Sequence, residues 1–309
     1  MQFAAMVQWG KRLLTVSVFV PLAVFCLLDD VRSAALIGLV SLGASYELVF
    51  TVVPNAVKAA AGADSATAAK TRVPLVAQLA SLLTSAAVLS TGYSQELSVF
   101  TEAVVMASIA LVTTVYMIGL RVTAPASDKA TGKPWSFDAP ALIALLMLLT
   151  SPALLAWPLS FAIRVRSLPN GMAWQLITGA AIWTADTGAL ILGSALGGPK
   201  MMPAVSPGKT VAGFVGSFVG AACVVYGFVW YDAGATLPLS DATCIALTLG
   251  LGGFAVVGDL LESSMKRAGQ VKDSGGVLPG QGGLLDRMDS AVFASPFIYF
   301  GVLHGLLGA

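Results

Sequence analysis

The chain has 309 residues, of which 57% are hydrophobic and only 11% are charged, and its mean hydropathy is +0.84. This apolar fraction exceeds that of a soluble domain, so the composition indicates a membrane protein with several spans. A net charge of +1 excludes the strongly basic surface that nucleic-acid binding requires. The three cysteines have no paired spacing, which argues against a disulfide framework or a zinc site.

Nine apolar runs come close to the roughly 20 residues that cross a hydrocarbon core. They lack the two-residue alternation of barrel strands and therefore predict transmembrane helices, although Pro152 and Pro158 interrupt the fifth. The runs are Leu13–Leu28, Ser33–Val53, Val73–Thr91, Val99–Leu120, Ala139–Trp157, Met172–Leu192, Val211–Tyr231, Asp241–Leu261 and Ala291–Leu307. The sequence thus predicts an all-α integral membrane protein of about nine helices. Residues 1–138 form an N-terminal region with four spans, and residues 139–309 form a C-terminal catalytic region with five.

Basic residues flank these runs unevenly. If the N-terminus is cytoplasmic, Arg32, Arg164 and Arg166 are the only ones of the 17 Lys and Arg residues that fall on the far side. The positive-inside rule then predicts that the remaining charged loops face the cytoplasm, in a bacterial inner membrane or an organellar membrane. Lys11 and Arg12 precede the first run without an evident cleavage site after it, which predicts a retained anchor rather than a signal peptide.

Isolated polar residues also occur within or beside the apolar runs. Asp186 in the sixth run requires a cation or a hydrogen-bond partner, which predicts a polar cavity open to the cytoplasm in the C-terminal half. Gly188 beside it allows a backbone or a ligand to approach closely. Glu47 in the second run has no second acid beside it, so helix packing or an interface role is favoured over a cavity. Arg164 and Arg166 are interpreted as anchors that extend toward lipid headgroups.

The segment Lys200–Thr210 is interpreted as a loop between the sixth and seventh spans. Its GKT ending resembles a P-loop, but Pro203 occupies a required glycine position and no strand precedes it. A weaker hypothesis remains, in which its lysines and hydroxyls contact phosphate beside a helix N-terminus. GLGGFAVVGD, at Gly250–Asp259, lies inside a span without a βαβ frame, so small-residue helix packing explains it better than dinucleotide binding.

Charge is concentrated between Gly258 and Ser290, where five acids and four bases occur. If the eighth helix continues past Asp259, then Asp259, Glu262, Ser263 and Lys266 share one face, because they follow at steps of three and four residues. A salt-bridged helix end and a functional site explain this column of charges equally well when it is taken alone.

The next residues favour function. The glycine-rich Pro279–Gly283 suits a loop whose amides approach an anion. Asp286 and Asp289 follow it three residues apart, and two carboxylates on one helical face can hold Mg²⁺ while waters and substrate phosphates complete the octahedron. Carboxylates for a metal and basic side chains for phosphates are typical of phosphoryl or nucleotidyl transfer.

The motif S-x-K-R-x(4)-K-D-x-G-x(2)-L-P-G-x-G-G-x-x-D-R-x-D, within residues 264–290, resembles the signature of the phosphatidate cytidylyltransferase family, also called CDP-diacylglycerol synthases. Three upstream blocks resemble that family too: Arg166–Gly171, Asp186–Ala189 and Ser206–Thr210. The resemblance implies a multi-pass enzyme of phospholipid biosynthesis that transfers CMP from CTP to phosphatidic acid, giving CDP-diacylglycerol and pyrophosphate. Mg²⁺ is the expected cofactor, K⁺ is kept as an accompanying monovalent cation, and a homodimer is an option.

The resemblance also assigns roles to residues. The metal candidates are Asp186, Asp259, Asp286 and Asp289. The catalytic candidates are Asp259, Lys266, Arg267, Lys272, Asp273, Asp286, Arg287 and Asp289. The candidates for binding substrate or phosphate are Lys200, Ser206, Lys209, Thr210, Ser264, Gly280, Gln281, Gly282 and Gly283.

Three positions depart from the family pattern. Gln281 replaces the usual His, Leu190 replaces an aromatic residue and Gly208 replaces a common Lys. Gln cannot take up a proton, which removes any acid–base role at position 281. A phosphate anion needs no strong base before it attacks, so the expected function stands.

Three alternatives remain on the sequence alone. The first is a related CTP-dependent transferase or kinase that acts on another lipid phosphate or an isoprenoid alcohol. The second is a transporter, which would be expected to show repeated broken helices in both halves, and no repeat is evident. The third is a degenerate homologue retained as a scaffold, which only Gln281 and the lesser departures raise.

Overall fold

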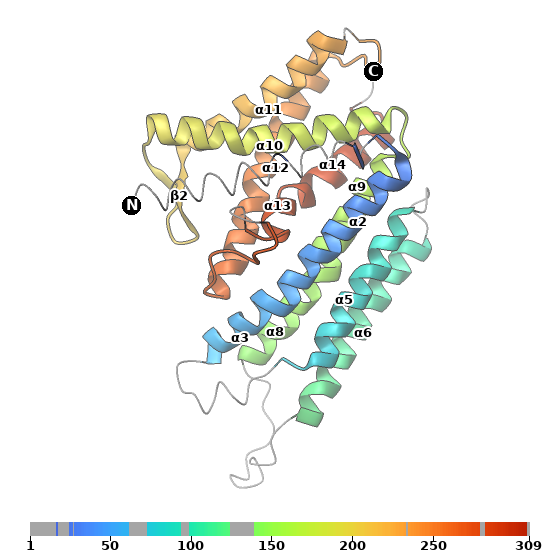
Figure 1. Cartoon of the computed structure of the whole chain (residues 1–309), viewed down its shortest axis with the longest axis vertical. Helices are drawn as coiled ribbons and strands as arrows, with labels where there is room; N and C mark the ends of the chain where they lie inside the picture. The colour runs from blue at the N-terminus through green and yellow to red at the C-terminus, as the bar shows by residue number, and fades with distance from the viewer. Residues whose placement is uncertain are drawn as a thin grey trace.

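The fold consists almost entirely of helices (Figure 1). The computed structural model describes residues 17, 25–26, 28–61, 73–93, 99–123, 139–232, 234–278 and 282–307, with the backbone alone at 99–102, 119–123 and 139. The elements of the first half are α2 (Asp30–Glu47), η1 (Leu48–Val52), α3 (Val53–Ala61), α5 (Leu75–Ser90), η2 (Thr91–Tyr93), α6 (Val99–Thr123), α8 (Ala139–Thr150) and η3 (Ser151–Ala156). Those of the second half are α9 (Trp157–Val165), α10 (Gly171–Leu196), β1 (Lys200–Met202), β2 (Ser206–Thr210), α11 (Val211–Asp232), α12 (Asp241–Ala268), α13 (Leu285–Met288) and α14 (Ala291–Leu303).

Among the residues that the structure describes, six helices are long and apolar enough to cross a membrane, judged by length and composition. They are Asp30–Ala61, Leu75–Tyr93, Pro140–Val165, Gly171–Leu196, Val211–Asp232 and Asp241–Ala268. The all-α, multi-pass membrane fold is therefore confirmed, whereas the predicted count of about nine helices is not. The run Leu13–Leu28 lies largely outside the described residues. The fourth and ninth runs correspond to α6, with its shorter apolar stretch Ala103–Ile118, and to the 13-residue α14.

Two of the spanning helices contain π-helical turns, η1 and η3. Pro152 lies in η3, and the wider turn lets one helix continue from Pro140 to Val165 past the two prolines that interrupt the fifth apolar run. Polar side chains of α5 cover both turns. The Gln78 amide donates to the Val49 carbonyl at 2.9 Å, and the hydroxyls of Ser85 and Ser151 lie 2.9 Å apart. Such side-chain hydrogen bonds satisfy polar groups that lipid cannot.

The buried apolar residues form two clusters. One joins α9, α10, α11, α12 and α14, and the other joins α2, η1, α3, α5, α6, α8, η3 and α13, with one residue each from α9 and α14. Figure 1 shows α2, α5, α6 and α8 running alongside one another, while α10 lies at a steep angle to them. α12 and α14 lie between α10 and α2, and the charged segment that follows α12 contacts α2 through α13. The proposed regional boundary at residue 138 stays a prediction.

The segment predicted to be a loop forms an antiparallel hairpin of β1 and β2, in which Lys200 pairs with Thr210. The loop prediction was therefore wrong. The strands are too short, and lack the alternation of polar and apolar residues, to be recognised from the sequence. The hairpin connects α10 to α11, and these two helices pack at very close range. A Cβ at Gly188 would collide with the Gly216 carbonyl of α11, which confirms the predicted close backbone approach.

The arginines before α10 are held by protein groups rather than extended toward headgroups. Arg164 is 1% exposed, and its guanidinium donates to the Thr91 carbonyl at 2.7 Å. Arg166 forms an ion pair with Asp30 at 2.5 Å. The interpretation as lipid-facing anchors is therefore wrong. Both arginines instead tie α9 to the ends of α5 and α2.

Candidate functional site

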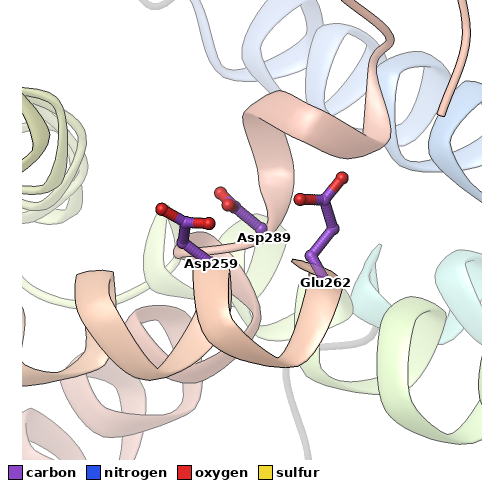
Figure 2. Close-up of side chains that lie close together, drawn as sticks. All are labelled: Asp259, Glu262 and Asp289. Carbon is purple, nitrogen blue, oxygen red and sulfur yellow. The ribbon is translucent and has the colours of Figure 1, made fainter. Parts of the chain in front are cut away.

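Three carboxylates converge at the end of α12 (Figure 2). Asp259 and Glu262 leave α12 one turn apart, and Asp289 comes from the turn that follows α13. One carboxylate oxygen of each lies within 4.8 Å of the others, which is close enough for a single cation to bind all three. Gly258 makes this approach possible, because a Cβ there would collide with the backbone carbonyl of Asp289.

The environment of Asp289 disfavours its ionised form. Burial, together with the negative charges of Asp259 and Asp186, raises the pKa of Asp289 to about 7, and hydrogen bonds from Ser290 offset only part of this effect. Asp186 of α10 is close enough to act on Asp289 electrostatically, whereas the polar cavity expected around Asp186 stays a prediction. A bound cation would offset the repulsion between these carboxylates.

Asp259 is held in place by its neighbours. Its Oδ2 forms an ion pair with Lys209 of β2 at 2.8 Å, and its Oδ1 accepts from the Ser263 hydroxyl at 3.0 Å. Lys209 also donates to the Val256 carbonyl of α12 at 3.3 Å. The hairpin therefore delivers one ammonium group to the cluster of acids.

A second ammonium group lies between two acids. Nζ of Lys266 is 2.6 Å from both Glu262 Oε2 and Asp286 Oδ1. The other oxygen of Glu262 is buried and has no hydrogen-bond partner among the described residues. The predicted column of Asp259, Glu262, Ser263 and Lys266 on one face is confirmed, because α12 continues to Ala268.

Asp286 is not one of the three converging carboxylates, but it shares the ammonium group of Lys266 with Glu262. Besides Lys266, it accepts from the Ser274 amide at 3.2 Å and the Gly283 amide at 2.7 Å, both at Oδ2. Burial raises the pKa of Asp286, but hydrogen bonds with Glu262, Lys266 and the Gly283 amide outweigh that effect and lower it to about 2. A metal role for Asp286 stays a prediction, and the contacts that it makes in this structure are those of an ion pair.

The other predicted residues surround this centre at varying distances. Arg267 is exposed, and its Nε donates to the Val205 carbonyl of the hairpin at 3.1 Å. Thr210 caps α11 by accepting from the Gly213 amide at 3.1 Å, which is a structural role. The exposed candidates are Lys200, Ser264, Lys272, Asp273 and Arg287, and Ser206 is partly buried. Gly280 and Gln281 lie outside the described residues, whereas Gly282 adopts a positive φ of 87°.

Two acids were not identified as site residues from the sequence. Glu262 carries a signal that could have identified it, because it stands one helical turn after Asp259 on the same face. Glu47 carries none: its Oε2 accepts from the hydroxyl of Ser274, which is 227 positions later in the chain, at 2.8 Å. Glu47 was predicted to have a role in helix packing or at an interface, and in the structure it joins α2 to the segment that holds Asp286.

Comparison with known proteins places this site in a family. The model of the cytidylyltransferase family matches residues 10–304. The chain is 41% identical over 141 residues to a phosphatidate cytidylyltransferase of Bacillus subtilis (strain 168), covering 45% of this chain and 51% of that protein. It is 40% identical over 147 residues to one from Synechocystis sp., covering 48% of each.

A third relative, the phosphatidate cytidylyltransferase of Staphylococcus saprophyticus, is 40% identical over 130 residues, which are 42% of this chain and 48% of that protein. The matched regions span about half the length of these curated relatives. The family match, in contrast, extends over nearly the whole chain and includes every residue of the site described above. The chain belongs to the cytidylyltransferase family.

Proposed function

We propose that this protein is a CTP:phosphatidate cytidylyltransferase that makes CDP-diacylglycerol and pyrophosphate. The observation that carries the proposal is the convergence of Asp259, Glu262 and Asp289 beside the ammonium group of Lys209. Such a pairing of acids and bases suits a reaction between two phosphate groups. The relatives named above support phosphatidate as the acceptor.

The proposed reaction is a displacement at the α-phosphorus of CTP. A phosphate oxygen of phosphatidate forms a new bond to that phosphorus, the bond to the bridging oxygen of the β-phosphate breaks, and pyrophosphate leaves with the electron pair. The attacking oxygen is already an anion, so the site needs to orient two charged groups and offset their repulsion rather than remove a proton.

The donor set fits Mg²⁺. Carboxylate oxygens are its preferred protein ligands, and the unpartnered, buried oxygen of Glu262 is a group that a cation would satisfy. Asp259, Glu262 and Asp289 would hold the ion, with Asp186 close by. When bound, the ion would neutralise negative charge on the phosphates. K⁺ is retained as a second, accompanying cation.

The basic residues would divide into two groups. Lys266 already contacts two carboxylates, and its side chain is only 13% exposed, so it would hold Glu262 and Asp286 in position. Lys209, Arg267 and the exposed basic side chains of the hairpin and of the segment after α12 would contact phosphate oxygens. Lys200, Lys272 and Arg287 belong to this second group.

We further propose that the site opens to the cytoplasm, where the unequal distribution of Lys and Arg predicts that the hairpin and the segment after α12 lie. The membrane would be a bacterial inner (plasma) membrane, which the bacterial relatives favour over an organellar membrane. The homodimer stays a prediction.

The test is to incubate the purified protein in lipid nanodiscs with labelled CTP, Mg²⁺ and one acceptor at a time. The acceptors are phosphatidic acid, an isoprenoid phosphate, an isoprenoid alcohol and diacylglycerol. We expect a cytidine-containing lipid only with phosphatidic acid. A product formed only with an isoprenoid acceptor would favour the related transferase or kinase instead, and no product with any acceptor would favour the scaffold.

A further inference from the structure

A buried acid from the N-terminal half extends into the segment that carries Asp286. Glu47 is the last residue of α2, its side chain is 3% exposed, and the π-helical turn η1 begins at the next residue. Its Oε2 accepts hydrogen bonds from the Ser274 hydroxyl at 2.8 Å and from the Leu285 amide at 3.0 Å. π-helical turns inside helices are frequent at functional sites, and this one follows the residue that makes the contact.

Ser274 connects Glu47 to the ion pair of the site. It is fully buried, and both its amide and its hydroxyl lie 3.2 Å from Asp286 Oδ2. A serine hydroxyl has one proton to donate, so Glu47 and Asp286 share this donor. Asp286 in turn accepts from Lys266 at 2.6 Å. A continuous chain of contacts therefore runs from Glu47 through Ser274 and Asp286 to Lys266.

The backbone of the segment closes tightly around the Glu47 carboxylate. A Cβ at Gly275 would collide with Oε1, and a Cβ at Gly283 would collide with Oε2. Oε1 is itself buried and has no hydrogen-bond partner among the residues that the structure describes. An incompletely satisfied buried carboxylate lowers stability, so stability alone does not explain an acid at this position.

We infer that Glu47 is a positioning residue of the nucleotidyl-transfer site: through Ser274 it fixes Asp286 and thereby orients Lys266 beside Glu262. The inference rests on the proposed function. The competing explanation is that Glu47 joins α2 to this segment for folding only, with no influence on turnover in the folded protein.

Kinetics distinguish these explanations. In folded protein, Glu47→Ala should lower kcat by about 10- to 100-fold, the range for residues that orient metal-site and catalytic groups, with little change in the KM for CTP. Glu47→Gln keeps a carbonyl oxygen for Ser274 and Leu285, so it should restore most of the turnover. Glu47→Ala combined with Ser274→Ala should be no slower than the slower single variant, because both act along one path.

Ser85→Ala is the matched control. It also removes a buried hydrogen bond, the 2.9 Å contact with Ser151, but in α5 and away from the segment 274–285. It should leave kcat unchanged and combine additively with Glu47→Ala. Wild-type kcat for folded Glu47→Ala, or an additive loss in the Glu47 and Ser274 pair, would overturn the inference.

A second readout is independent of activity. Leu278 is buried, so a cysteine there, in a chain whose Cys26, Cys223 and Cys244 are replaced by Ala, should react slowly with a maleimide. Adding Glu47→Ala should raise that rate, and adding Ser85→Ala should not. An unchanged rate would show that Glu47 does not order the segment. If the wild type transfers no CMP to phosphatidate, the proposed function fails, and the thiol rates still decide whether Glu47 positions this segment.

Discussion

Asp286 and Asp289 stand three residues apart in the chain, yet their carboxylates have different neighbours. Asp289 joins Asp259 and Glu262, whereas Asp286 accepts hydrogen bonds from Lys266, Ser274 and Gly283. Their spacing predicted one shared face, but α13 is a single turn that ends between them. The two acids are therefore expected to respond differently to the same substitution.

Asp289→Asn should lower kcat about 100-fold at saturating CTP without reducing stability, because it removes a proposed cation ligand and also relieves repulsion from Asp259 and Asp186. Asp286→Asn should reduce both activity and stability, because it leaves Lys266 with one carboxylate fewer. Turnover and denaturation midpoints, measured on the same preparations, check this pair. Equal loss of stability in both variants would contradict the division of roles.

The raised pKa of Asp289 predicts a pH dependence of stability in protein freed of divalent ions. Between the ordinary value of 3.8 and about 7, the folded chain keeps a proton that the unfolded chain has released. Stability should therefore decrease as pH rises through this window, since the folded state binds more protons there. The measurement is unfolding from pH 4 to 8 with and without Mg²⁺, with Asp289→Asn as the control.

The wild type should lose more stability than Asp289→Asn as pH rises, and the difference should shrink when Mg²⁺ favours the ionised carboxylate. Parallel curves for the two proteins in chelator would show that Asp289 does not titrate in this window.

At the scale of elements, the site depends on how the hairpin and α12 dock. The sequence predicted that Asp259, Glu262 and Lys266 share a face if the helix continues past Asp259, because they follow at steps of three and four residues, and α12 does continue to Ala268. The hairpin was missed because β1 and β2 have no alternating pattern. Its position depends on two non-local contacts with α12: Lys209 pairs with Asp259, and Arg267 donates to the Val205 carbonyl. Non-local contacts of this kind leave no periodic signal in the sequence.

Two lysines of the hairpin should therefore differ in effect. Lys209→Gln removes the ion pair to Asp259, so it should weaken both CTP binding and the apparent affinity for Mg²⁺. Lys200→Gln changes an exposed side chain and should raise only the KM for CTP. Initial rates over a grid of CTP and Mg²⁺ concentrations separate the two effects, and identical Mg²⁺ dependence in both variants would argue against a role for Lys209 beside the proposed metal site.

At the scale of the whole molecule, the membrane class and the family motif were both readable from the sequence, because hydropathy and a long ordered motif are local properties. The contact of Glu47 with the segment around Ser274 was not, since it joins residues 227 positions apart.

Orientation can be tested through α10, whose two ends must lie on opposite sides if it spans the membrane. In a chain without native cysteines, Ser167→Cys before α10 should react with an impermeant thiol reagent from outside intact cells, and Gly208→Cys after it should react only once the cells are opened. Both positions are exposed in the structure. The reverse pattern would place the hairpin on the side opposite the cytoplasmic pool of CTP.

The most direct test of the central claim follows the two ends of CTP separately in nanodiscs that contain phosphatidic acid. With label on the α-phosphate, radioactivity should appear in a cytidine-containing lipid, and with label on the γ-phosphate it should appear only in released pyrophosphate. Glu262→Gln, which alters the converging acids, should reduce both signals together. Transfer of the γ-label to lipid, or formation of the labelled lipid at the wild-type rate by Glu262→Gln, would contradict nucleotidyl transfer at this site.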